Sequence, residues 1–332
     1  MTTQPTATEP QRLQEVLNGI LFGKPELTAM TTAAFFAGGH VLLEGLPGLG
    51  KTVLAKSMAA ATGLDYKRIQ FTPDLMPADI TGTHLLEDGP EGKRLRFVPG
   101  PVFTHFLLAD EINRASPKTQ AALLEAMGEG SVTHMGQSRT LEAPFFVIAT
   151  QNPIEMEGTN PLPEAQLDRF AIKLMVAATD EASLLRIISE RREGSPPTPE
   201  AVLDRAAVLR CREAIEQVFL PEPVAVMISR LVARANPEHP DAGEAVKKHV
   251  RYGPSARAAI WLTRMARALA FIEGRQGVGF EDVRSAAPHV LRHRLILSYG
   301  ARLDSVTAES LIAELVETTE KDVLGGQDHG SA

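Results

Sequence analysis

The chain of 332 residues is long enough for about two domains and for a hydrophobic core that needs no disulfide. Its 34 basic and 41 acidic residues give a formal net charge of −7, which argues against bulk binding to nucleic acid or anionic membranes. The single cysteine, Cys211, excludes an intrachain disulfide framework and a cysteine zinc site. We interpret it as a small buried residue on a helix.

The ends of the chain carry no pattern typical of export. Residues 1–10 are polar and rich in threonine, without the basic and apolar stretches of a signal peptide. No apolar run approaches the roughly 20 residues that a membrane-spanning helix needs. We therefore expect a cytoplasmic protein with no membrane span, with disordered ends at residues 1–10 and 321–332.

The first half of the chain alternates short apolar runs with helical stretches. Continuous apolar strands separated by helices predict a parallel sheet that is buried on both faces. The alanine-rich residues 51–61 favour a helix. The expected strands occupy residues 40–44, 66–71, 106–109, 145–150 and 171–176.

Two segments interrupt this pattern and are predicted to be insertions that project from the sheet. Residues 73–101 are rich in proline, glycine and charge, and contain one strand-like piece at 94–98. Residues 130–141 alternate weakly, which predicts a hairpin. Irregular surface loops are the alternative interpretation of both segments.

The sequence changes character after residue 176. Residues 193–199, Glu-Gly-Ser-Pro-Pro-Thr-Pro, would break any regular element. No strand pattern follows, and the chain up to residue 320 is predicted to form an all-helical second domain that starts near Ala177. Its expected helices occupy residues 200–218, 223–235, 254–272 and 280–297.

Residues 45–52, Gly-Leu-Pro-Gly-Leu-Gly-Lys-Thr, match the phosphate-loop pattern between an expected strand and an expected helix. Glycines let backbone N–H groups turn toward phosphate oxygens, and the helix N-terminus directs its positive dipole end at the same anion. Lys51 is expected to reach the β- and γ-phosphates of ATP, and Thr52 to bind Mg²⁺. A coincidental glycine-rich turn is the alternative. The predicted nucleotide-binding residues are Gly45, Pro47, Gly48, Leu49, Gly50, Lys51 and Thr52.

Two carboxylates directly follow the apolar run 106–109. Asp110 and Glu111 would lie at the carboxyl end of a buried strand, the edge at which α/β sheets bind ligands. Asp110 is expected to act on Mg²⁺, and Glu111 to polarise a water for in-line attack on the γ-phosphoryl group. Asn152 follows another strand, where it could orient that water or contact the γ-phosphate, although Asn-Pro alone is only a turn signal. Surface carboxylates are the alternative for the acidic pair.

These motifs resemble the MoxR family of AAA+ ATPases, in the clade with a helix-2 insert. The most specific blocks are residues 107–115, Leu-Leu-Ala-Asp-Glu-Ile-Asn-Arg-Ala, and residues 162–170, Leu-Pro-Glu-Ala-Gln-Leu-Asp-Arg-Phe. The resemblance implies an α/β core of the P-loop NTPase type over residues 11–176, with AAA+ insertions, followed by an all-α lid over residues 177–320. Further matching stretches occupy residues 40–52, 118–127, 149–153, 252–258 and 291–294.

The resemblance also implies roles that spacing does not give. Asn152 corresponds to the sensor 1 residue, Arg169 to the arginine finger that acts on a neighbouring subunit's nucleotide, and Arg257 to a sensor 2 arginine that contacts the γ-phosphate in cis. Such proteins form rings, usually hexamers, because the site is shared between subunits. From the residues alone, Arg169 would pair with Asp168 or Glu164 on an exposed turn, and Arg257 would belong to a basic helix face.

Two positions depart from the family pattern. Residues 22–24, Phe-Gly-Lys, stand where relatives often have Val-Gly-Gln near the adenine, so Gly23 is kept as a nucleotide-site residue while base recognition stays open. Residues 253–257, Gly-Pro-Ser-Ala-Arg, replace the commoner Gly-Ala-Ser-Pro-Arg, which keeps the arginine but alters its turn. Arg114 also lies beside the site, and its position leaves open whether it faces the nucleotide or a subunit boundary.

The leading hypothesis is a Mg²⁺- and ATP-dependent hexameric ring that remodels protein clients. The resemblance implies von Willebrand factor A domain proteins as partners, and complex maturation or metal insertion as the outcome. One of the insertions, which contain His84, His134 and Met135, would supply the client-binding loop. The alternatives are a nucleic-acid motor, disfavoured by the net charge and by the 5% aromatic content, a small-molecule kinase and a chelatase-like subunit.

Overall fold

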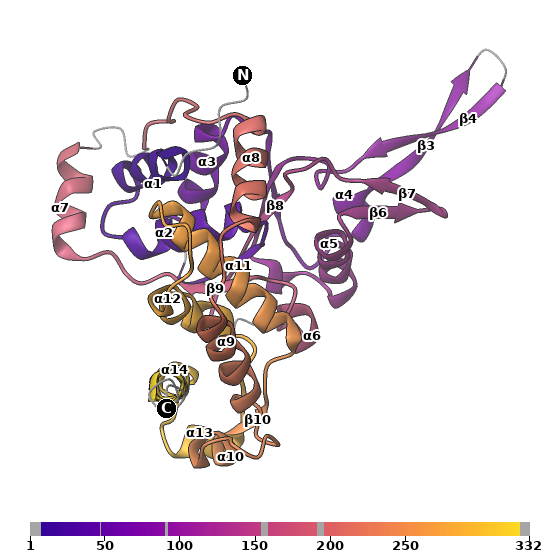
Figure 1. Ribbon diagram of the computed structural model, residues 1–332. Coiled ribbons are helices and arrows are strands. Elements are labelled where there is room, and N and C mark those ends of the chain that lie inside the picture. The colour runs from indigo at the N-terminus through magenta and orange to yellow at the C-terminus, as the bar shows by residue number, and fades with distance from the viewer. Residues whose placement is uncertain (1–7, 47, 90–91, 154–158, 191–195, 326–332) are drawn as a thin grey trace.

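The computed structural model of the chain describes residues 8–46, 48–89, 92–153, 159–190 and 196–325. A five-stranded parallel sheet lies at its centre, in the strand order β2-β5-β8-β1-β9 (Figure 1). This arrangement confirms the predicted parallel α/β core, and each strand falls on one of the five predicted segments. The strands are β1 (Val41–Glu44), β2 (Tyr66–Gln70), β5 (Phe106–Asp110), β8 (Phe146–Gln151) and β9 (Ile172–Met175).

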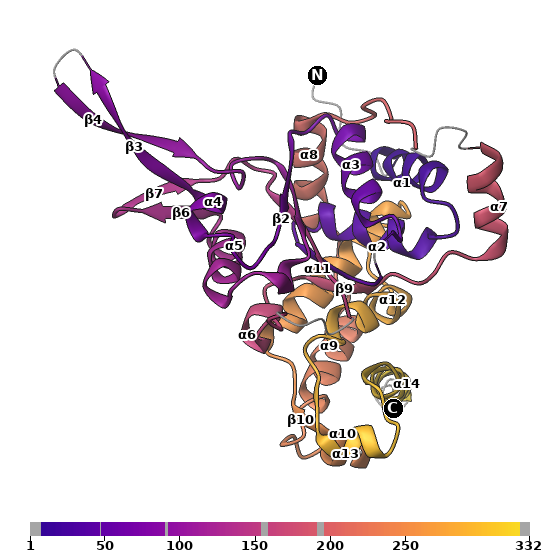
Figure 2. The ribbon, with the colours of Figure 1, turned by 180° about the vertical axis from the view of Figure 1, so that it is seen from behind.

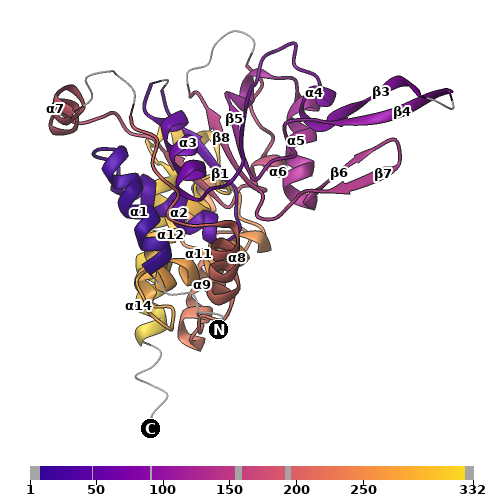
Figure 3. The ribbon, with the colours of Figure 1, turned by 90° about the horizontal axis from the view of Figure 1, so that it is seen from above.

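The two faces of the sheet belong to two hydrophobic clusters because side chains alternate along each strand. Val41 and Leu43 pack into the cluster beneath the N-terminal helices and the lid, whereas Leu42 points into the opposite cluster with helix α5 (Pro117–Glu129). Both faces are therefore covered, as the continuous apolar strands predicted (Figure 3). The exposed side chains of β2 mark the edge of the sheet.

Three helices cover one face beside the first strands: α1 (Thr8–Ile20), α2 (Pro25–Phe36) and α3 (Lys51–Ala61). The helix expected at residues 51–61 is α3. Helix α1 corrects the expectation of disorder over residues 1–10, because it begins at Thr8. Glu9 anchors this helix, because it pairs with Arg210 and accepts a hydrogen bond from the thiol of Cys211. Cys211 is a buried residue on a helix, as predicted.

Both predicted insertions are ordered hairpins that project from the same side of the molecule (Figure 1). The first contains α4 (Pro77–Thr81) and the pair β3 (Gly82–Gly89) and β4 (Gly92–Pro99), where the sequence indicated a single strand. The second pairs β6 (Ser131–His134) with β7 (Gln137–Thr140), which confirms the predicted hairpin. A short 3-10 turn, η1 (Ile112–Arg114), precedes α5.

The second half of the chain is mainly helical, and its helices pack on the core (Figure 2). The expectation of an all-helical region is wrong in one detail, because two very short strands pair antiparallel: β10 (Val250–Tyr252) and β11 (Ile296–Leu297). The helix expected at 280–297 therefore ends earlier, at Leu291. The helices are α6 (Glu164–Leu167), α7 (Glu181–Glu190), α8 (Arg205–Glu216), α9 (Glu222–Arg234), α10 (Glu244–His249), α11 (Ala256–Ile272), α12 (Phe280–Leu291), α13 (Tyr299–Leu303) and α14 (Ala308–Gly325).

The end of the chain also differs from the expectation. Helix α14 continues to Gly325, so residues 321–325 are helical, and residues 326–332 lie outside the described part. Val323 is buried and Asp322 pairs with Arg234 at 2.6 Å, which together hold this last turn against α9. A domain boundary near Ala177 stays a prediction, because one hydrophobic cluster joins α2 to the lid helices α8 and α11. Within the described residues, no helix is long and apolar enough to cross a bilayer.

Candidate nucleotide site

The carboxyl ends of β1, β2, β5 and β8 meet at one edge of the sheet and enclose a cavity of about 350 Å³. The loop before α3 forms one wall and the acidic residues after β5 form the other. The structure thus brings Lys51, Thr52, Asp110, Glu111 and Asn152 together, as their positions after predicted strands indicated. The cavity is lined by Gly48, Gly50, Lys51, Thr52, Val53, Arg68, Gln70, Asp110, Glu111 and Asn152.

The phosphate loop has the backbone geometry that its glycines permit. Gly48 and Gly50 have φ values of 82° and 88°, which side-chain-bearing residues rarely adopt. Gly45 lies so close to Val176 that a Cβ atom there would stand 2.8 Å from the Val176 carbonyl oxygen. Leu49 packs against the core, and Pro47 lies outside the described residues.

The Lys51 ammonium is buried and donates to the carbonyl oxygen of Gly45 at 2.5 Å. Burial lowers the pKa of Lys51, while the negative charges of Asp110 and Glu111 act in the opposite direction. The lysine therefore lies folded against its own loop, between the glycine backbone and the two carboxylates. A phosphate entering the cavity would offer this cation a stronger partner than a neutral carbonyl.

Thr150 on β8 fixes the acidic pair in place. Its hydroxyl donates to Asp110 Oδ1 at 2.6 Å and accepts the backbone N–H of Glu111 at 2.8 Å. Glu111 has φ 56°, in the left-handed region, which turns the chain sharply at the end of β5. The strand register that sets Ala109 opposite Ala149 thus decides where both carboxylates point.

Cationic and amide side chains hold both carboxylates in this structure. Arg68 on β2 donates to Asp110 Oδ2 at 2.6 Å, and Gln70 donates to Glu111 Oε2 at 2.9 Å. Sequence reasoning missed these two residues, although polar side chains two apart at the end of a strand share one face and are a usable signal. Arg114 donates to the same Glu111 oxygen at 3.0 Å, which places it beside this carboxylate.

Asn152 lines the cavity beyond the end of β8, and its carbonyl oxygen accepts the amide of Asn113 at 3.4 Å. Gly23 lies elsewhere, in a separate hollow of about 320 Å³ past the end of β9. That hollow is also lined by Val176, which lies against Gly45 of the phosphate loop. Lys24 closes part of it by donating to the Ala177 carbonyl oxygen at 2.7 Å.

The two candidate arginines do not line the phosphate cavity of their own chain. Arg169 donates to the Leu124 carbonyl oxygen at 2.6 Å and lies against Gly128 on α5. Arg257, at the start of α11, lies 3.6 Å from Asp168 Oδ2 and is largely exposed. Arg169 therefore lies against α5 of the core and Arg257 beside Asp168, and the roles of both arginines toward nucleotide stay predictions.

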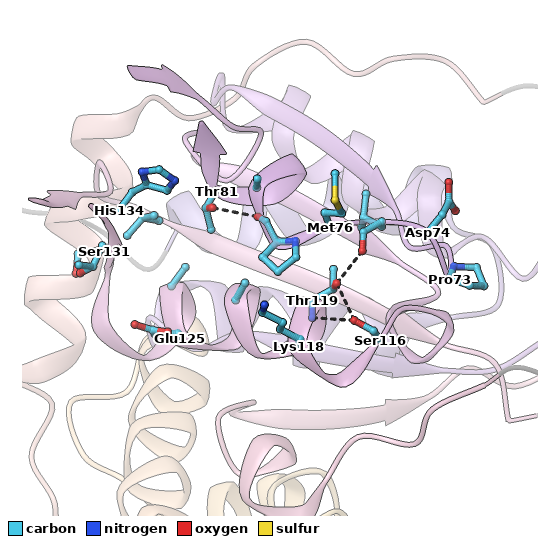
Figure 4. A pocket seen from close by; sticks show the side chains of 17 residues that line it. Pro73, Asp74, Met76, Thr81, Ser116, Lys118, Thr119, Glu125, Ser131 and His134 are labelled. Carbon is cyan, nitrogen blue, oxygen red and sulfur yellow. Dashed lines mark hydrogen bonds between the residues drawn. The ribbon is translucent and has the colours of Figure 1, made fainter. Parts of the chain in front are cut away.

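A second, larger hollow of about 640 Å³ lies between α4, α5 and β6, away from the phosphate loop (Figure 4). Thr119 on α5 donates to the Leu75 carbonyl oxygen at 2.7 Å, which ties the first insertion to α5. The two hairpins also contact each other, because His84 Nδ1 and His134 Nδ1 lie 2.9 Å apart. The insertions are thus fixed to one another and to the helix that follows Glu111.

Comparisons with known proteins agree with this geometry. Residues 40–172 match the model of the ATPase family associated with various cellular activities (AAA), and residues 242–315 match the AAA lid domain. The chain is 41% identical to chaperone MoxR1 of Mycobacterium tuberculosis, over 90% of this chain and 78% of that protein. It is 34% identical to protein MoxR of Methylorubrum extorquens, over 92% and 93%.

A solved crystal structure from Cytophaga hutchinsonii extends the similarity to the whole fold. It covers 94% of both chains with a TM-score of 0.84 and 36% sequence identity. The similarity thus extends over nearly the whole of both chains. The chain therefore belongs to the MoxR family of AAA ATPases and is an ATP-binding ATPase.

Proposed function

We propose that this ATPase requires Mg²⁺, works as a hexameric ring and remodels protein clients. The observation that carries the catalytic part is the convergence of Lys51, Thr52, Asp110, Glu111 and Asn152 on one cavity. A hydroxyl and a carboxylate are oxygen ligands of the kind that Mg²⁺ prefers, so Thr52 and Asp110 fit this ion. The bound ion would neutralise charge that develops on the transferring phosphoryl group.

Each residue of the cavity then has a distinct task. Lys51 leaves the Gly45 carbonyl and pairs with the phosphates, while the N–H groups at the start of α3 bind the same oxygens. Glu111 orients the attacking water and accepts its proton, with Asn152 positioning the γ-phosphate or that water. Arg68 now holds Asp110, and Arg114 holds Glu111. Both arginines release these carboxylates before the step, so that Asp110 can bind the metal ion and Glu111 the water.

The place of Arg169 supports a ring. Its guanidinium lies outside the phosphate cavity of its own chain, and we assign it to the site of a neighbouring subunit. An arginine supplied in trans accelerates phosphoryl transfer by roughly 10³–10⁵-fold in known systems. Arg257 remains the proposed sensor 2 arginine, and a contact with the γ-phosphate of its own chain requires it to leave Asp168.

The client-binding role is assigned to the two hairpins. Leu86 on β3 lies directly opposite Leu95 on β4, and both are more than half exposed, as is Met135 at the tip of the second hairpin. Exposed apolar side chains on protruding hairpins favour contact with partly unfolded protein. The relative MoxR1 is named a chaperone, and the family resemblance supports a von Willebrand factor A domain partner and a role in complex maturation or metal insertion.

The variant Glu111→Gln tests the catalytic assignment. Because the amide keeps the shape but cannot accept the proton of water, we expect ATP hydrolysis to fall about 100-fold while ATP binding is retained. Sedimentation with ATP should show a stable ring. Glu125→Gln, an exposed change on α5, is the matched control and should behave like the wild type. Normal hydrolysis by Glu111→Gln would disprove the role of this residue.

The trapped variant also tests the cellular role. With ATP it should retain client protein and a von Willebrand factor A domain partner on affinity purification, and Lys51→Ala should not. A nucleic-acid motor would behave differently. If single-stranded DNA raises ATP turnover severalfold and binds with a steep salt dependence, the chaperone proposal is wrong.

A further inference from the structure

Arg294, just beyond α12, is a buried arginine whose guanidinium uses every donor that it has. Its side chain is 1% exposed. The Nε atom donates to Asp168 Oδ1 at 2.7 Å, and Nη1 donates to the carbonyl oxygens of Val290 and Ala171 at 2.5 and 3.1 Å. Nη2 donates to the carbonyl oxygens of Phe170 and Asp168 at 2.6 and 3.1 Å. The five N–H groups of a guanidinium are all satisfied.

Four of these five acceptors belong to one short stretch of the core, residues 168–171, which leads into β9. Arg169 lies inside that stretch, so the backbone on both sides of it is bound to the lid. The preceding residue of the lid adds to this contact, because His293 Nε2 lies 3.2 Å from the Phe170 carbonyl oxygen.

A second lid helix reaches the same carboxylate from the other side. Ser255, the N-cap of α11, donates to Asp168 Oδ2 at 3.0 Å, and Arg257 lies 3.6 Å from that oxygen. Asp168 therefore joins the start of α11 to the end of α12, next to the residue assigned to the neighbouring site. Movement of either helix would displace the backbone that carries Arg169.

We propose that Arg294 is a positioning residue for Arg169: it fixes the backbone around Arg169 to the lid helices, so that the orientation of the lid sets the direction of Arg169 at the subunit boundary. The proposal rests on the proposed role of Arg169 in trans. Residues 291–294, none of which lines the phosphate cavity, thereby have a role in the shared site.

The test compares Arg294→Lys with Arg169→Ala and with the double variant. Lysine keeps the charge but has three donors in place of five, so the segment 168–171 is held less firmly. We expect kcat to fall about 10-fold in Arg294→Lys, with ATP affinity of the subunit unchanged within about twofold. In the Arg169→Ala background the same change should have no further effect, because the two residues act through one group. Arg284→Lys, on an exposed ion pair with Glu320, is the control.

Hydrogen exchange supplies a readout that does not depend on catalysis. The N–H of Ala171 donates to the His40 carbonyl oxygen and that of Phe170 to the Leu167 carbonyl oxygen. Both amides should exchange faster in Arg294→Lys, whereas amides of α3 behind the phosphate loop should not. Asp168→Asn, which keeps the backbone acceptors, gives the same test in a milder form if the lysine variant does not fold.

The outcomes separate the two proposals. If Arg169→Ala lowers kcat and Arg294→Lys multiplies that loss, Arg294 does not act through Arg169 and the present inference is overturned while the finger stands. If Arg169→Ala leaves kcat of the assembled protein unchanged, the role of Arg169 fails and the inference fails with it. Loss of ATP affinity in Arg294→Lys or Asp168→Asn would also contradict positioning, since it would show damage to the subunit's own site.

Discussion

Two aspartates in this molecule make ion pairs of nearly equal length in opposite surroundings. Arg68 lies 2.6 Å from Asp110 at the carboxyl edge of the sheet, and its side chain is 46% exposed. Arg294 lies 2.7 Å from Asp168 at the junction of core and lid, and its side chain is 1% exposed. Water can replace Arg68 as the partner of Asp110 at little cost in free energy, but it cannot reach the buried pair of Arg294 and Asp168.

The exposed ion pair at the sheet edge can break when a ligand binds, whereas the buried ion pair at the junction fixes the lid to the core. At the sheet edge, Lys51, Arg68 and Arg114 occupy positions from which they can turn to an incoming phosphate. At the junction, the guanidinium of Arg294 is committed to the backbone around Arg169. The same residue types thus serve binding in one region and positioning in the other.

The largest effect is expected on stability. Arg294→Met leaves the Asp168 carboxylate and several buried carbonyl oxygens without their donor, so we expect the free energy of unfolding to fall by about 3 kcal/mol. Arg68→Met should change it by less than about 1 kcal/mol, because the pair is exposed. Urea denaturation of both variants measures the comparison. Equal losses would show that exposure does not distinguish the two pairs.

Lys51→Ala should weaken ATP binding about 100-fold, because it removes a charge-assisted contact to the phosphates. Within the described residues Lys51 donates its one hydrogen bond to the neutral Gly45 carbonyl oxygen, so thermal stability without nucleotide should change little in this variant. Calorimetric titration with ATP gives the affinity, and Lys118→Ala, an exposed change on α5, is the control. Unchanged affinity would refute the assignment of the phosphate loop.

Acid should destabilise the fold through two buried histidines, His40 inside the core and His293 at the junction of core and lid. The Val147 N–H donates to His40 Nδ1 at 3.1 Å, so the neutral ring carries its proton on Nε2, 3.3 Å from the Met127 carbonyl oxygen. Burial lowers the pKa of His40 to about 4, and it lowers that of His293 as well. The unfolded chain therefore binds more protons, and stability decreases as pH falls from 6.5 towards 4.

We expect His40 alone to contribute about 1 kcal/mol per pH unit within this window. Urea midpoints measured between pH 7 and pH 4 should fall less steeply in His40→Asn than in the wild type. His239→Asn, whose ring Nδ1 accepts the N–H of Asp241 at the surface, should keep the wild-type slope. Identical slopes in all three proteins would exclude His40 as the source of acid sensitivity.

The smallest effect concerns the exchange of partners at Asp110. Arg68→Gln frees this carboxylate, so the Mg²⁺ concentration that gives half-maximal ATP hydrolysis should fall about threefold. Arg96→Gln breaks an exposed pair with Glu87 on the first hairpin and should leave this concentration unchanged. A higher Mg²⁺ requirement in Arg68→Gln would mean that Arg68 assists the metal site.

Local patterns predicted the strands and the phosphate loop because their signals lie within a few neighbouring residues. Apolar runs such as 106–109 specify a buried strand, and the glycines of 45–52 specify a turn that only they adopt easily. Helix α2 shows the limit of this approach. This helix is buried on nearly all sides, and the Thr31 hydroxyl donates to the Leu27 carbonyl oxygen within the helix itself. Because no polar face alternates with an apolar one, the sequence has no helical periodicity here.

The sequence by itself determined the class of fold and brought out Lys51, Thr52, Asp110, Glu111 and Asn152, which line one cavity, since these depend on backbone geometry and on the carboxyl ends of parallel strands. Only the tertiary structure decided which cations hold Asp110 and Glu111, because Arg68 and Gln70 reach them through strand register. It also decided the place of Arg294, which lies 126 residues from Asp168 along the chain. A contact over that distance leaves no local pattern, since it forms only when lid and core pack together.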